Sequence, residues 1–405
     1  MTEAVDWLRR PETIRSRCHL LLDRAEAGRL GHFTIAPERF GDAVDCVLDT
    51  IAANYPSLRI PYHSRWRHFT VGGRARAEGV FEAAAGRDPG ALLRARFDLV
   101  VTSVLLDAGA GADWSYVAQD GQRFARSEGL AVASLEAFAS GLFSADPDDP
   151  LRADGRKLAT LSAEELATAF QAGPANPLVG LEGRAGLMQA LGLRVSSAPE
   201  WFGAEGRVGR LVDAMIDPEG GSAVSAGRIL ATVLQALGPI WPGRIVVDGV
   251  NLGDVGRHPL AGDGGPGEGL VPFHKLSQWL TYSLIEPLQA AGIDVTGLAV
   301  LTGLPEYRNG GLMIDSGLVV PRDPTLLARP LRPDEEPIVE WRALTVALLD
   351  RIADAVRLRL GRDEHGLPLA AVLEGGTWAA GRRLAALRRA GGAPPITLDS
   401  DGTVF

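Results

Sequence analysis

The sequence predicts a mainly α protein with a minor β component, and three observations lead to this prediction. Long segments repeat their apolar residues at the helical period, strand signals are few, and roughly half of the 405 residues fall in helical patterns, more than the usual third. The glycine-rich breaks do not shift the composition enough to fix a domain boundary. We therefore expect a single multi-helical unit over 1–405, or two lobes with a boundary near 173–222.

Two of the helices begin at clear start signals. Pro37 fits the first turn of a helix that runs toward Ala53, and Ser162 with Glu165 forms a capping box. Apolar residues at helical spacing predict further helices at about 91–105, 130–143, 182–191, 206–216, 223–237, 273–291 and 338–361. The two candidate strands are 244–248 and 58–60.

Charge and composition argue against several classes of protein. The net charge of −9 disfavours binding to nucleic-acid backbones and anionic membranes, although a local basic pocket is compatible with it. The two cysteines, Cys18 and Cys46, are too few for a disulfide framework. No apolar run reaches the roughly 18–20 residues of a membrane span, and the acidic start lacks signal-peptide features. We expect a cytoplasmic protein without nucleic-acid or membrane partners; the oligomeric state stays open.

The first polar cluster is Arg65-Trp66-Arg67-His68. Guanidinium and imidazole groups beside an aromatic ring could hold a phosphate or sugar while stacking on a planar group. An amphipathic surface turn, with arginine stems covering the tryptophan, is the structural alternative.

A second cluster extends from Asp107 to Glu128. Asp107 ends an apolar helix, where the carbonyl end of the helix dipole disfavours a carboxylate, and Trp114 and Tyr116 follow it. A carboxylate at such a helix end beside two aromatic residues fits the wall of a ligand site. A helix C-cap followed by a packed loop explains them equally well.

Two later segments add titratable groups. Asp248 follows the clearest strand signal, where turns often expose catalytic carboxylates, although an Asx-type turn at Asp248 or Asn251 is the structural alternative. Lys275 and Gln278 lie three residues apart on one face of a helix start.

The most informative segment is Glu306-Tyr307-Arg308-Asn309, which lies between two apolar runs. Burial of an acid, a phenol, a guanidinium and an amide is costly unless these groups pair or hold a ligand. The structural alternative is a buried ion pair of Glu306 with Arg308 or Lys275.

Other chemistries have little support in the sequence. Only His63 and His68 are closely spaced among the histidines, and no carboxylate pattern beside them is typical of a zinc or iron site. The chain has neither a Walker motif nor a Gly-x-Ser-x-Gly nucleophile elbow. We therefore expect neither a metal nor a cofactor.

These segments, together with 176–184, resemble the family of uracil catabolism protein 4, also called the Urg-three-like family. The resemblance covers about 10–400 and is most specific at 126–129 and 305–315. It implies a place in uracil catabolism.

A shorter segment of about 45 residues is similar to the queuosine salvage glycosylases. The matching residues are Lys275, Gln278, Tyr307 and Arg308. Glu306 stands where that family has an acidic catalytic residue, although it is Glu rather than Asp, and the residues after Arg308 depart from the pattern. This resemblance implies a DNA-glycosylase-like helical core that does not use DNA as substrate.

Together the two resemblances imply hydrolysis of the N-ribosidic bond of a ribosylurea, expected as its 5′-phosphate. Glu306 would stabilise an oxocarbenium-like sugar or activate water, while Asp248 and Lys275 are candidates for helping urea to leave. The phosphate would be neutralised by Arg65, His68, Arg126 and Arg308, and the urea bounded by Trp114 and Tyr116. The other candidates for substrate binding are Asp107, Glu128, Gln278, Tyr307 and Asn309.

Two other functions remain open from the sequence. One is a C–N amidohydrolase that cuts the acyl-urea made by opening the uracil ring of uridine monophosphate. The other is a non-catalytic nucleotide-binding partner of the ring-opening enzyme.

Overall fold

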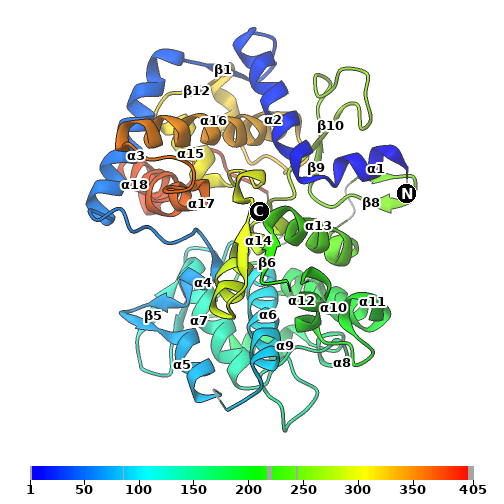
Figure 1. The fold of residues 1–405 in the computed structure, drawn as a ribbon. Coiled ribbons are helices and arrows are strands. Elements are labelled where there is room, and N and C mark those ends of the chain that lie inside the picture. The colour runs from blue at the N-terminus through cyan, green and yellow to red at the C-terminus, as the bar shows by residue number, and fades with distance from the viewer. Residues whose placement is uncertain (1, 85, 217–220, 243–244, 400–405) are drawn as a thin grey trace. The chain divides into compact units, whose positions relative to one another are not determined.

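The computed structural model describes residues 2–84, 86–216, 221–242 and 245–399, which divide into two compact units (Figure 1). The described residues of 2–63, 245–278 and 297–399 form the first unit, and those of 64–242 and 279–296 form the second. The described residues of 173–222 thus fall inside the second unit. Both units consist mainly of helices with short strands paired two at a time, so the mainly α prediction is confirmed.

The first unit contains both ends of the described chain. Its helices are α1 (Glu3–Leu8), α2 (Pro11–Glu26), α3 (Phe40–Asn54), α15 (Tyr307–Asp315), α16 (Glu336–Leu360), α17 (Leu369–Val372) and α18 (Trp378–Arg388). Its strands are β1 (Phe33–Ile35), β7 (Val246–Val247), β8 (Val250–Asn251), β9 (Val255–Arg257), β10 (Leu270–Pro272) and β12 (Val319–Pro321). Helix α14 (Lys275–Ala290) begins in this unit and continues in the second.

Helix α16 is the central element of the first unit. It packs against α2, α3 and α15, and α15 packs in turn against α18 (Figure 1). Pro337 lies in the first turn of α16, and Gly361 ends the helix with a φ of 60°. Strands β1 and β12 pair antiparallel beside it, and β9 pairs with β10 in the same sense. The start of α15 is therefore supported from two sides, by α16 and by α18.

The second unit contains the middle of the chain. Its helices are α4 (Arg65–His68), α5 (Arg76–Ala83), α6 (Pro89–Leu105), α7 (Arg126–Ala139), α8 (Gly155–Leu158), α9 (Ala163–Ala169), α10 (Leu181–Ser197), α11 (Pro199–Phe202), α12 (Leu211–Met215) and α13 (Ala226–Leu237). Its strands are β2 (Thr70–Val71), β3 (Arg74–Ala75), β4 (Ser115–Val117), β5 (Arg123–Ala125), β6 (Ala223–Ser225) and β11 (Asp294–Thr296). Strands β6 and β11 pair parallel, and the other two pairs are antiparallel.

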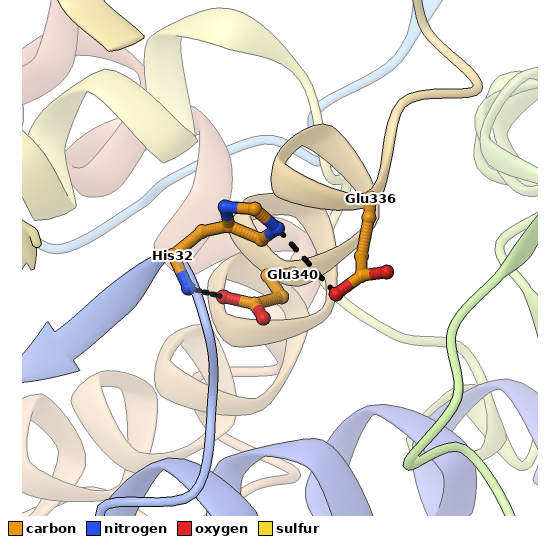
Figure 2. A group of neighbouring side chains, drawn as sticks. All are labelled: His32, Glu336 and Glu340. Carbon is orange, nitrogen blue, oxygen red and sulfur yellow. Dashed lines mark hydrogen bonds and ion pairs between the residues drawn. The ribbon is translucent and has the colours of Figure 1, made fainter. Parts of the chain in front are cut away.

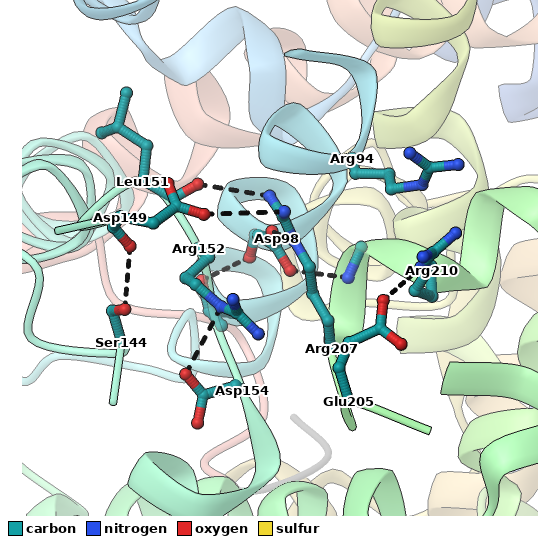
Figure 3. A network of polar contacts seen from close by, with 12 residues as sticks. Arg94, Asp98, Ser144, Asp149, Leu151, Arg152, Asp154, Glu205, Arg207 and Arg210 are labelled. Carbon is teal, nitrogen blue, oxygen red and sulfur yellow. Dashed lines mark hydrogen bonds and ion pairs between the residues drawn. The ribbon is translucent and has the colours of Figure 1, made fainter. Parts of the chain in front are cut away.

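A buried polar network joins α6 to the 3-10 turn η2 (Val208–Arg210) in this unit (Figure 3). The Asp98 carboxylate accepts hydrogen bonds from Arg207 Nε at 2.7 Å and from the Gly209 backbone N–H at 2.6 Å. Gly209 lies so close to α6 that an added Cβ would be 2.2 Å from the Arg94 carbonyl oxygen. Hydrogen bonding and a small residue thus allow close packing of the two elements.

Most predicted helices are confirmed, with ends shifted by a few residues. The capping box of Ser162 and Glu165 is present at the start of α9. The pattern at 206–216 divides into η2 and α12. The strand predicted at 58–60 is wrong, because Leu58 has a φ of 55°, a left-handed conformation that an extended strand does not allow.

The other predicted strand is shorter than expected. It covers only Val246–Val247, and its residue 244 lies outside the described residues. Across the described ranges, no helix combines the length and the apolar character that crossing a bilayer requires.

Candidate functional site

The segment at the start of α15 gathers several of the predicted functional groups. Glu306 is the N-cap of this helix, and its carboxylate accepts the backbone N–H groups of Arg308 at 2.8 Å and Asn309 at 2.6 Å. An ionised carboxylate is well placed here because the positive end of the helix dipole complements its charge. The carboxylate has about four acceptor positions, so two hydrogen bonds leave room for a water or a substrate hydroxyl.

Arg308 and Asn309 add polar groups without protein partners to the same turn. The Arg308 guanidinium lies over the Trp378 ring at 4.6 Å and beside the Tyr307 ring at 5.2 Å, and no described residue accepts a hydrogen bond from it. Asn309 is fully buried; its side-chain nitrogen donates to the Leu304 carbonyl, while its side-chain oxygen has no partner among the described residues. Buried acceptors are usually hydrogen-bonded, so this oxygen is suited to accept a hydrogen bond from a ligand or a water.

Two reciprocal hydrogen bonds tie the start of α14 to the loop before α15. The Gln278 side-chain nitrogen donates to Thr302 Oγ1 at 2.7 Å, and its oxygen accepts the Thr302 backbone N–H at 2.9 Å. Lys275, one turn earlier, donates its backbone N–H to Asp254 Oδ2 at 2.9 Å. The segments that carry Lys275 and Glu306 are therefore connected within one unit.

Asp254 and Arg342 complete this connection, and sequence reasoning did not identify either as a site residue. Arg342 Nη1 and Nη2 each lie 2.7 Å from an oxygen of Asp254, and its Nε donates to the Pro305 carbonyl at 3.4 Å. Burial alone would raise the pKa of Asp254, but the Arg342 charge and hydrogen bonds outweigh it and lower the pKa. The sequence does contain a signal for Arg342, because it is an arginine within the apolar pattern of the helix predicted at 338–361.

Asp248 lies apart from this connection, at an exposed hairpin turn. Asp248 and Gly249 link β7 to β8 with φ values of 51° and 76°, as a two-residue type I′ turn requires. The Asp248 carboxylate accepts a hydrogen bond from the Thr2 hydroxyl at 2.7 Å, and the Asn251 side chain accepts one from the Gly253 N–H. The structural alternative, a turn at Asp248 and Asn251, therefore accounts for this segment.

The predicted residues of the second unit centre on a buried ion pair. Arg65 Nη1 lies 3.1 Å from Asp107 Oδ1, and both side chains are buried. Arg65 Nε also donates to Ser103 Oγ, and His68 Nδ1 lies 3.5 Å from its Nη1. Burial lowers the pKa of Arg65, and Asp107 opposes this effect.

The environment of Asp107 accounts for a carboxylate at a helix C-terminus. Arg184 donates to the carbonyls of Leu106, Ala108 and Gly109 just after α6. Two guanidiniums therefore balance both the carboxylate and the carbonyl end of the helix dipole.

Trp114 and Tyr116 are core residues of the second unit. The Trp114 indole donates to the Phe170 carbonyl and stacks on the Phe170 ring. The Tyr116 hydroxyl donates to Glu136, and burial followed by this contact raises its pKa. The packed-loop alternative fits both aromatic residues.

Arg126 and Glu128 lie in the first turn of α7, and Arg126 has a φ of 55°. The predicted site residues thus form two sets. One comprises Asp248, Lys275, Gln278, Glu306, Tyr307, Arg308 and Asn309 in the first unit; the other comprises Arg65, His68, Asp107, Trp114, Tyr116, Arg126 and Glu128 in the second.

Two cavities lie at other positions. One of about 610 Å³ in the second unit includes Arg152 and Arg156 in its lining, and one of about 620 Å³ in the first unit includes Asp315 and Arg389. No predicted site residue lines either cavity.

Comparison with known proteins identifies the family. The family model described as "Protein of unknown function (DUF1688)" matches residues 7–405. The chain is 39% identical over 413 residues to "Protein urg3" of Schizosaccharomyces pombe, with all of both chains covered. It is 38% identical over 436 residues to "Uracil catabolism protein 4" of Lachancea kluyveri, with 99% of each chain covered. The resemblance found in the sequence is confirmed: the chain belongs to the DUF1688 family, with these two proteins among its relatives.

Proposed function

We propose that this protein acts in uracil catabolism and hydrolyses the N-ribosidic bond of a ribosylurea, with the 5′-phosphate as its substrate form. The catabolic role rests on the name of the Lachancea kluyveri relative, Uracil catabolism protein 4. The reaction rests on one observation, the polar group at the start of α15. There a capping carboxylate, an unpaired buried amide oxygen and a guanidinium without an acceptor lie within four consecutive residues.

Each group of this turn has a part in the proposed reaction. The C1′–N bond breaks, the water oxygen bonds to C1′ and gives up one proton to the Glu306 carboxylate, and the departing urea nitrogen takes a proton. Glu306 stabilises the positive sugar and orients the water, because its two capping hydrogen bonds hold a carboxylate in place. The Lys275 ammonium is the assigned proton donor for urea, since its helix start is connected to Glu306 through Asp254 and Arg342.

Arg308 is assigned to the substrate phosphate. Its guanidinium is held between aromatic rings while its N–H donors have no protein acceptor among the described residues, which suits a charged ligand. Arg65 is assigned to structure instead, because Asp107 and Ser103 engage its guanidinium in a buried site.

The experiment supplies purified protein with enzymatically ring-opened uridine monophosphate and with synthetic ribosylurea 5′-phosphate. Free urea and reducing pentose phosphate are then assayed. Equal amounts of both products from ribosylurea phosphate support the proposal. Cleavage of the acyl-urea that leaves the ribosidic bond intact would indicate the amidohydrolase instead. Tight binding of either compound without products would indicate a non-catalytic partner.

A further inference from the structure

A histidine and two glutamates from distant parts of the first unit converge at the start of α16 (Figure 2). His32 immediately precedes β1, while Glu336 and Glu340 lie one helical turn apart on the same face of α16. Ligand atoms of the three side chains all lie within 4.8 Å of one another. We propose that His32, Glu336 and Glu340 form a binding site for a divalent first-row transition metal ion.

One separation in the cluster has the length expected between two ligands of one ion. Donor atoms that share a tetrahedral zinc ion at about 2.0–2.2 Å lie roughly 3.3–3.6 Å from one another. His32 Nε2 lies 3.4 Å from Glu336 Oε1, close to such an edge. One imidazole and two carboxylates suit Zn²⁺, Fe²⁺ or Mn²⁺ and leave positions for water.

The charges of the cluster favour a cation. Two carboxylates close together repel each other, and Glu340 is fully buried. Among the described residues, no lysine or arginine pairs with Glu336 or Glu340, and the basic side chains near them are His32 and His258. A divalent ion would supply the positive charge that no lysine or arginine provides there.

Backbone groups hold Glu340 in a fixed orientation. Its oxygens accept the N–H groups of Gly31 at 3.0 Å, His32 at 3.0 Å and Phe33 at 3.1 Å. Hydrogen bonds of this kind commonly orient ligating carboxylates and are themselves important for metal affinity. They also fix the loop that carries the His32 imidazole, so the site is organised before an ion arrives.

His258 positions Glu340 and is not assigned as a ligand. Its Nδ1 accepts the Leu260 N–H at 3.1 Å, so the ring proton of the neutral imidazole is on Nε2. That nitrogen lies 3.2 Å from Glu340 Oε1 and can donate to it. A ligating histidine usually donates its second nitrogen, whereas this one accepts.

The test is equilibrium dialysis of the full chain against Zn²⁺, with metal content measured by mass spectrometry, and a parallel Co²⁺ absorption spectrum. We expect one equivalent of Zn²⁺ and visible Co²⁺ bands from a histidine-containing site. His32→Ala and Glu336→Gln should each weaken Zn²⁺ binding by at least about tenfold. Both side chains are partly exposed, 32% and 42%, so these variants are expected to fold, and their circular dichroism spectra check this.

The matched controls are His365→Ala and Glu38→Gln, which change an exposed histidine and an exposed glutamate outside the cluster. They should bind Zn²⁺ as the wild type does. The proposal is overturned if the wild type binds no more Zn²⁺ than the His32→Ala variant. Equal loss of binding in the controls would overturn it too, because nonspecific surface binding would then explain the metal. It is independent of the proposed glycosidic reaction, which none of these measurements tests.

Discussion

At Glu306 a structural and a proposed chemical role coincide on one carboxylate. Its oxygens cap α15 through the N–H groups of Arg308 and Asn309, which any good N-cap residue could do. Only the charge and the remaining acceptor positions are specific to a reaction. A substitution at this position must therefore separate capping from catalysis.

Asn is among the best N-cap residues but carries no charge, so Glu306→Asn separates the two roles. We expect its thermal midpoint to stay close to that of the wild type, while turnover of ribosylurea phosphate falls by about 10²–10⁴-fold. Glu306→Ala should lose both turnover and about 1 kcal/mol of stability. Near-normal turnover in Glu306→Asn would leave Glu306 as a helix cap alone.

Arg308 supports a prediction that depends on the substrate. Loss of a charge-assisted hydrogen bond to phosphate costs about 1.5–3 kcal/mol, or roughly 10–160-fold in affinity. Arg308→Ala should therefore raise KM for the 5′-phosphate and leave KM for the unphosphorylated ribosylurea nearly unchanged, as steady-state kinetics can measure. Equal effects on both substrates would assign Arg308 to packing on Trp378.

At the scale of elements, two close contacts decide how helices are placed. Helix α18 approaches α15 at Gly381, where an added Cβ would lie 2.1 Å from the Arg308 carbonyl oxygen. Helix α6 meets η2 through Asp98, Arg207 and Gly209 (Figure 3). In each contact, a glycine lets the backbones of two elements approach more closely than a side chain with a Cβ would allow.

Gly381→Ala should destabilise the protein because backbone atoms cannot move aside as a flexible side chain can. Overpacking of this kind costs about 1–3 kcal/mol, measured as the free energy of unfolding in urea. The displaced start of α15 should also lower turnover. Gly79→Ala is the matched control: Gly79 lies within helix α5 with open space around its Cβ position, so this change should be neutral or slightly stabilising. Similar losses in both variants would contradict the prediction.

The Asp98 network predicts a pH dependence of stability. Burial raises the pKa of Asp98 from 3.8 to about 7, although Arg207 acts in the opposite direction. Because the folded-state pKa lies above the unfolded one, this group's contribution to stability is complete below about pH 4 and is lost as pH rises through about 7. The stability advantage of the wild type over Asp98→Asn should therefore shrink between about pH 4.5 and about pH 8.

Urea unfolding at several pH values measures this difference. Asp213→Asn, which removes a half-exposed carboxylate paired with Arg94, is the control and should show no such change. A difference between the wild type and Asp98→Asn that stays constant with pH would contradict the raised pKa.

At the scale of the whole molecule, net charge sets the expected partners. A net charge of −9 opposes binding to the phosphate backbone, which supplies most of nonspecific affinity for DNA. A resemblance to a DNA-glycosylase-like core therefore does not imply a DNA substrate. On a protein with this net charge, a local group of basic residues is a specific indication of an anionic ligand.

We expect no binding to uracil-containing or normal duplex DNA in electrophoretic shift assays, even at low salt, where electrostatic attraction is strongest. The positive control is an inactive variant of uracil-DNA glycosylase, which should shift the uracil-containing duplex in the same assay. A salt-sensitive shift with this protein would contradict the prediction and reopen nucleic acid as a ligand.

Local pattern alone determined much of this protein. The apolar period predicted α6, α14 and α16, and the capping box predicted the start of α9, because helix contacts and caps depend on neighbours within a few residues. The segment from Glu306 to Asn309 was likewise visible as polar residues between apolar runs. The strand expected at 58–60 failed because its apolar pattern carries no information about the left-handed φ of Leu58.

Tertiary structure decided what partners these residues have. Asp254 meets Arg342, Arg65 meets Asp107, and His32 meets Glu336 only because distant segments pack together. Spacing in the sequence cannot reveal such pairs, since the residues of each lie tens to hundreds of positions apart. The same packing buried Trp114 and Tyr116 in a core and left Asp248 at an exposed turn, because burial is a property of the assembled elements and not of any one segment.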